Sequence, residues 1–145
     1  MDDWKSDLDS FFEAKASREE KQSKNFEANR KRVSDYISSV VIPAFEELKI
    51  ELEKHGREVT IHMGSDLASL EVNYQMDLEL DYRFKVRISA KGTFPYPETR
   101  FMEQGKRYIA EGYFRSGSQD FTIEDLSREE IIKSFLVDYK NHMSR

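Results

Sequence analysis

The stretch LEVNYQMDLELDYRFKVRISA, from Leu70 to Ala90, decides the fold class because its residues alternate strictly between apolar and polar. Every even-numbered position is apolar and every odd one is polar, which is the period of a β-strand with one face on a core and one in water. A straight strand of this length would run about 70 Å, against a radius of gyration near 15 Å for a domain of this size. We therefore expect two strands joined by a turn somewhere between Asp77 and Leu80.

The polar positions of this stretch are acidic first and basic from Arg83 onward. Even residues stay on one face of a hairpin only if paired residue numbers have an even sum, which requires a loop of odd length. A turn centred on Leu80 would pair Asp77 with Arg83, and a turn one residue earlier would pair Glu71 with Arg87. In either register the change of sign is explained as cross-strand pairing within the hairpin.

Helical patterns precede the sheet. Residues 2–15 carry apolar side chains at helical spacing, which predicts a short amphipathic helix. Residues 16–25 are polar, and this second segment forms either a solvated helix or a flexible tether. A wide apolar stripe from Phe26 to Leu52 predicts the main helix. Pro43 predicts a kink in it, or a second helix that begins there, and Gly56 predicts its end.

Shorter patterns complete the chain. Val59 to Met63 alternates as a strand, while two prolines between Gly92 and Glu98 indicate a rigid aromatic loop outside the sheet. Further strands are expected at 107–115 and 120–123, separated by a hairpin loop at 116–119. Ser127 and Glu130 have the spacing of a capping box, which predicts a C-terminal helix. The fold class is therefore α+β, a single domain with an antiparallel sheet of about five strands packed by a long kinked N-terminal helix and a C-terminal helix.

Composition limits the possible functions. The chain has 145 residues, no cysteine and a formal charge of −5, so disulfides and thiolate metal sites are excluded. No apolar run approaches the ~20 residues needed to cross a bilayer. We expect an acidic cytoplasmic protein without a membrane partner, in which residues 1–25 form an amphipathic helix and charged tether and residues 26–145 form the domain.

Catalytic signatures are missing from the sequence. It has neither a phosphate-binding glycine loop nor a nucleophile elbow, and a metal trio of Glu51, His55 and His62 is much less plausible than ordinary helix-end and surface histidines. We therefore expect no catalytic residue, no cofactor and no metal, and hence no enzyme.

Two apolar elements suggest recognition of a protein partner, through a helix in a groove or through a preordered loop. We expect an interaction or scaffold module, with self-association as a homodimer through the N-terminal helix or a sheet edge. The partner-binding residues would be Trp4, Leu8, Phe11 and Phe12 in the N-terminal helix, and Phe94 and Tyr96 in the aromatic loop.

Two alternatives remain open. The first is nucleic-acid binding through a basic sheet face, which sequence charge disfavours. The second is a small-ligand pocket between sheet and helices, behind Tyr74, Tyr82 and Phe84. The residues of the nucleic-acid alternative are Arg83, Lys85, Arg87, Arg107 and Arg115.

Overall fold

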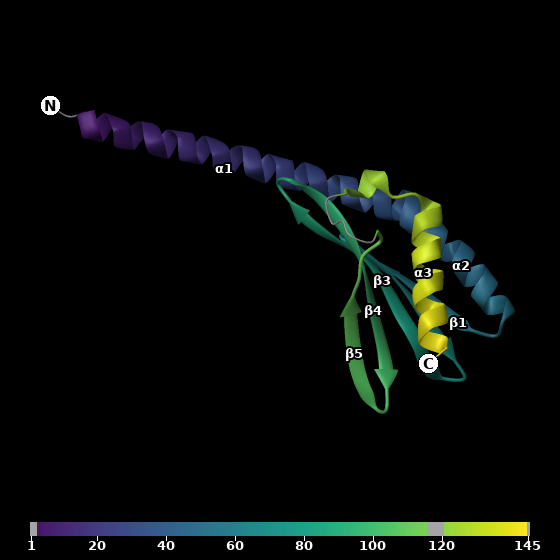
Figure 1. Ribbon diagram of the computed structural model, residues 1–145. Helices are drawn as coiled ribbons and strands as arrows, with labels where there is room; N and C mark the ends of the chain where they lie inside the picture. The colour runs from purple at the N-terminus through teal and green to yellow at the C-terminus, as the bar shows by residue number, and fades with distance from the viewer. Residues whose placement is uncertain (1–2, 116–120, 145) are drawn as a thin grey trace.

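The computed structural model describes residues 3–115 and 121–144. Three helices pack on one side of a five-stranded sheet (Figure 1). All strands are antiparallel to their neighbours, in the order β1-β2-β3-β4-β5, which confirms the predicted α+β class. The elements are α1 (Asp3–Tyr36), a π-helical segment (Ile37–Val41), α2 (Ile42–Lys54), β1 (Glu58–Met63), β2 (Leu67–Tyr74), β3 (Asp77–Ser89), β4 (Gly92–Glu103), β5 (Lys106–Glu111), a 3-10 turn (Ile123–Asp125) and α3 (Arg128–Met143).

Helix α1 runs without a break through residues 16–25, so this polar stretch is a solvated helix and not a tether. Every residue from 3 to 28 is exposed, and we call this part of α1 the arm. Figure 1 shows the arm projecting from the rest of the protein. Asn29 is the first buried residue, and its side-chain amide donates to the backbone carbonyl of Ser89 at 2.8 Å. The body of the protein therefore begins at Asn29.

The chain changes direction between α1 and α2, near Pro43 as predicted (Figure 1). The bend coincides with a π-helical turn, in which the amide of Ile42 donates to the carbonyl of Ile37, five residues back. Pro43 follows this turn directly, in the first turn of α2, and has no N–H to donate to the carbonyls of the π-helical segment. A local π-helical turn is a known cause of such bends.

One hydrophobic core lies between the helices and the sheet. The even-numbered apolar residues of β2 up to Val72 and of β3 from Leu80 point into it, as the alternation predicted, and meet α1, α2 and α3, whereas Tyr74 and Leu78, next to the turn, lie outside the core. Tyr82 and Phe84 are fully buried, and the Tyr82 ring contacts Phe45 and Phe135 edge-on. The opposite side of the sheet is uncovered by the helices, and we call it the open face.

The β2–β3 turn lies at Gln75 and Met76, before the predicted position, and both residues have positive φ values of 52° and 71°. A two-residue loop alone would put the even-numbered residues of β2 and those of β3 on opposite faces of the sheet. One extra residue in β3, Glu79, restores it, because Asn73 pairs with Leu78 whereas Val72 pairs with Leu80. The even-sum rule thus holds beyond this β-bulge, although the odd-length loop predicted from it is wrong.

The predicted pairing of charges within this hairpin is also wrong. Glu71 faces Asp81 and Ser69 faces Arg83, so no acidic residue of β2 lies opposite the basic part of β3. The carboxylates that meet Lys85 and Arg87 come from β4 and β5, and Arg83 pairs with Asp81 of its own strand.

Residues 92–98 form part of β4 and not a loop, which corrects a third prediction. The carbonyl of Pro97 accepts a hydrogen bond from Gly112 at 2.9 Å, so the peptide groups of Pro97 point away from β3. Pro95, two residues earlier, has the same orientation, and the β4–β5 pairing begins only at Glu98. The prolines therefore occupy positions at which a strand does not need their missing N–H groups.

The C-terminal part shows one confirmed element and two corrections. Ser127 and Glu130 form the predicted capping box of α3. The predicted strand at 107–115 ends at Glu111, and Ile123–Asp125 is a 3-10 turn, so the strand expected at 120–123 is wrong. A second capping box, between Thr122 and Asp125, holds this segment in a turn. The hairpin loop expected at 116–119 lies outside the described residues, as does residue 120.

Candidate functional site

The arm displays the largest exposed apolar side chains predicted for partner binding. Trp4, Leu8, Phe11 and Phe12 are 65%, 47%, 54% and 54% exposed. The rings of Phe11 and Phe12 contact each other edge-on, with centroids 5.4 Å apart, and form a small apolar ridge. Within the described residues, no element of the body covers them.

Phe94 and Tyr96, the other predicted partner-binding residues, lie on the open face of β4 and are not joined to the arm. Their strand partners are Arg87 and Lys85. The side chains of Phe94 and Tyr96 are both half-buried. The guanidinium of Arg87 lies 4.0 Å from the Tyr96 ring centroid. Tyr96 is therefore already engaged by a cation, as an aromatic face prefers.

Four basic residues of the open face are paired with carboxylates. Lys85 and Arg100 lie 3.2 Å and 2.8 Å from the two oxygens of Glu98, which is only 3% exposed. Arg83 bonds Asp81 at 3.1 Å. Arg87 lies 3.0 Å from Glu111 of β5, the next strand but one in the sheet. These contacts neutralise much of the positive stripe that the sequence suggested.

The pKa of Glu98 shows the strength of this pairing. Burial raises the pKa of a carboxyl group, but hydrogen bonds from Arg100 and Lys85 outweigh burial, and the pKa of Glu98 is lowered. Glu98 therefore stays ionised and holds two cations on the open face.

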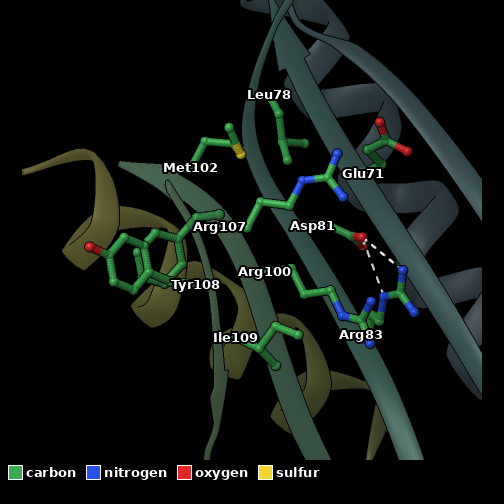
Figure 2. Close-up of a pocket in the computed structure, with 10 residues that line it drawn as sticks. Glu71, Leu78, Asp81, Arg83, Arg100, Met102, Arg107, Tyr108 and Ile109 are labelled. Atoms are coloured by element: carbon green, nitrogen blue, oxygen red, sulfur yellow. Dashed lines mark hydrogen bonds and ion pairs between the residues drawn. The ribbon is translucent and has the colours of Figure 1, made fainter. Parts of the chain in front are cut away.

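Arg107 and Arg115, the other two residues predicted for nucleic-acid binding, differ in their contacts. Arg115 forms a two-pronged bond with Glu130 of α3, at 2.9 Å for each nitrogen–oxygen pair, on the helical side of the molecule. Arg107 has no ion pair within residues 3–115 and 121–144, and Figure 2 shows it reaching across from β5 toward Leu78 of β3. The five predicted residues thus do not form one free basic surface.

Arg107 lines a hollow of about 480 Å³ against β3, β4 and β5 (Figure 2). Its apolar members include Leu78, Met102 and Ile109, and its charged members include Arg83 and Asp81. Leu78 reaches this side because the bulge at Glu79 interrupts the alternation. The alternation gave no sign of the hollow for that reason. A pocket was expected behind Tyr74, Tyr82 and Phe84, but the side chains of Tyr82 and Phe84 are completely buried in the core, and Tyr74 is 37% exposed.

A second polar cluster lies on the helical side of the bulge. Glu79 accepts two hydrogen bonds from Arg57, at 3.1 Å each, and one from the Tyr139 hydroxyl at 2.7 Å. Tyr74 covers the guanidinium, with its ring centroid 4.1 Å from the Arg57 carbon. Burial tends to raise the pKa of Glu79, but these bonds lower it, while burial raises the pKa of Tyr139 to about 12. The cluster joins the connection between α2 and β1, strand β3 and helix α3, and its polar groups are bonded to one another.

The described residues contain no group of three or more side chains suited to a metal ion. His62, a member of the trio considered from sequence, lies 3.8 Å from Glu71 on the neighbouring strand and is largely exposed. Among the described helices, none has the length and apolar character needed to span a membrane.

Comparison with known proteins gives one partial similarity. A glycine betaine transporter of Acinetobacter baylyi is 25% identical over 111 residues, which are 77% of this chain but 17% of the transporter. The chain therefore spans about a sixth of the length of this curated relative. No family model matches the chain, and no solved structure matches it.

Proposed function

We propose that the protein is a non-catalytic cytoplasmic interaction module that associates with other protein chains through the arm. The strongest support comes from the part of α1 that projects from the body. It carries four exposed apolar side chains, those of Trp4, Leu8, Phe11 and Phe12. Exposed apolar patches on soluble proteins often mark sites of interaction with other molecules. A helix with an apolar face is also a common ligand for a groove or another helix.

The partial similarity to the transporter agrees with a module. A segment of 111 residues that accounts for 17% of a long protein is of the size expected for one domain among others. Such a domain can act by binding, whether it stands alone or is linked to a larger chain.

The two buried carboxylates agree with a binding role without catalysis. The buried carboxylates Glu79 and Glu98 are each bonded to cations, and the pKa of each is lowered. A general acid needs a raised pKa, and a general base needs a free lone pair near a substrate site. Neither group offers these properties.

The test compares the full chain with the variant W4A/L8A/F11A in capture experiments on cell extracts and in light scattering. We expect the wild type to associate with a protein chain, its own or another, and the variant to lose that association while its circular dichroism stays unchanged. I50A is the matched control, because Ile50 is 59% exposed on α2, outside the arm. Equal association of the wild type and W4A/L8A/F11A would contradict the proposal.

Small-ligand binding is a second candidate, and the hollow around Arg107 favours it. An amphipathic anion would place its apolar part against Met102 and Ile109 and its charge near the guanidinium. Titration with octanoate, followed by backbone amide chemical shifts, tests it. Shifts confined to β3–β5 that disappear in R107Q would support a ligand site, and no shifts at millimolar octanoate would refute it. Nucleic-acid binding is less favoured because of the ion pairs described above.

A further inference from the structure

We infer that the partner of the arm is a second copy of this chain, bound antiparallel, arm against arm. The inference rests on the proposed function and specifies its partner. Its first basis is the geometry of α1. At 3.6 residues per turn, Leu8 and Phe26 are about five turns apart, as are Phe11 and Asn29. The apolar side chains of the arm therefore lie on the same face of α1 as the residues that pack on the body.

No described residue of the body covers this face. Trp4 is about 33 Å along the helix from Phe26, at 1.5 Å per residue, and the helix between them is unbroken. The body begins only at Asn29. A second copy of the chain is a partner that can cover it.

Charge along the arm selects the direction of the second chain. Between residues 3 and 13 there are four acidic side chains and one basic, whereas between 15 and 24 there are four basic and two acidic. Two arms in parallel would place like charges together. Two antiparallel arms centred on Lys15 place residues 3–13 of each copy beside residues 17–27 of the other, which carry three basic and three acidic side chains, so this arrangement avoids the repulsion of the parallel one.

The spacing of residues on the face fits a two-fold axis. The positions on the face repeat at intervals that are symmetric about Lys15, so that Trp4 of one copy meets Phe26 of the other and Leu8 meets Gln22. Near the axis, each Lys15 already lies 3.8 Å from Glu19 of its own helix. Pairing brings each Lys15 close to Glu19 of the other copy as well, so the two lysines at the axis are balanced by two carboxylates.

The apolar area available indicates a modest affinity. The five apolar side chains of each arm are Trp4, Leu8, Phe11, Phe12 and Phe26, and they are 37–65% exposed. At on the order of 100 Å² each, two copies would bury roughly 1,000 Å², near the lower limit for a specific interface. We therefore expect a dimer that forms reversibly with protein concentration.

Single-cysteine variants test the orientation, because the full chain has no cysteine of its own. The variants are K15C, L8C and Q22C, with S6C as control, since Ser6 lies on the opposite side of the arm. After mild oxidation we expect K15C to form a disulfide with itself, and L8C with Q22C when the two are mixed. L8C alone, Q22C alone and S6C should remain uncross-linked.

Each outcome decides the inference. Cross-linking of L8C with itself would indicate parallel arms and overturn it. So would a monomeric mass in light scattering of the wild type at several hundred micromolar. If the wild type is monomeric but captures another protein that W4A/L8A/F11A does not, self-association is wrong and the proposed function stands.

Discussion

Glu79 is the residue on which the bulge of β3 depends, since its carboxylate joins Arg57 and Tyr139. We expect E79Q to lower the free energy of unfolding by about 2 kcal/mol, because a partly buried guanidinium loses its counter-charge. E111Q, which removes an exposed partner of Arg87, should cost less than about 1 kcal/mol. Urea unfolding at pH 7 measures both. Similar losses in the two variants would show that the cluster does not stabilise the bulge.

Glu98 makes the stability depend on pH. Because the folded state lowers its pKa, the unfolded chain binds more protons in acid, and stability falls as pH decreases below the ordinary carboxyl pKa. The contribution of Glu98 is complete above that pKa. E98Q should therefore be less stable than the wild type at pH 7, and the difference should shrink between about pH 5 and 3. Unfolding curves that stay equally far apart across this range would contradict this account.

At the scale of elements, the β2–β3 turn is built from residues poorly suited to it. Gln75 and Met76 have positive φ, which a two-residue turn of this kind requires and which Asn-Gly adopts most easily. Met76 is 94% exposed, so replacing it removes no packing. We expect Q75N/M76G to raise the free energy of unfolding by about 0.5–1 kcal/mol.

The control for this prediction is the β3–β4 turn at Ala90 and Lys91, where neither residue has a positive φ. A90N/K91G should leave the stability unchanged or lower it slightly, because glycine adds freedom only to the unfolded chain there. Thermal unfolding of both variants provides the comparison. A gain in A90N/K91G equal to that in Q75N/M76G would mean that turn conformation is not the cause.

The same turn shows how far sequence patterns reach. Alternation over residues 70–90 predicted the two strands and most of their buried face correctly, but Tyr74, Met76 and Leu78, which it also assigned to the core face, lie outside the core at the turn and the bulge. It could not locate the turn, because Gln75 and Met76 carry no turn signal and a bulge compensates for them. Prolines misled in β4 for a related reason: their effect depends on which side of the strand faces a neighbour, and only the sheet order shows that.

The candidate sites were predictable in unequal measure. Apolar residues of the arm stand out from sequence because helical spacing places them on one face. The neutralisation of the basic residues by carboxylates could not be predicted from the sequence. Glu98 and Glu111 become partners of Lys85 and Arg87 only through the register of β3, β4 and β5. The hollow beside Arg107 likewise depends on the bulge that turns Leu78 outward.

For the whole molecule, the contrast between arm and body makes a prediction about autonomy. All residues from 3 to 28 are exposed, so the arm adds nothing to the hydrophobic core. A chain that begins at residue 26 should therefore fold by itself, which is the division predicted from sequence. At low micromolar concentration its free energy of unfolding should lie within about 0.5 kcal/mol of the full chain.

The dependence of the unfolding temperature on protein concentration shows whether the arm pairs with a second copy. If the arm pairs with a second copy, the unfolding temperature of the full chain should rise with protein concentration, because the dimer stabilises the folded state by mass action. The chain from residue 26 should show no such rise. Scanning calorimetry at low and high concentration measures both. A shortened chain that is unfolded at every concentration would mean that the body needs the arm, and the boundary at residue 26 would then be wrong.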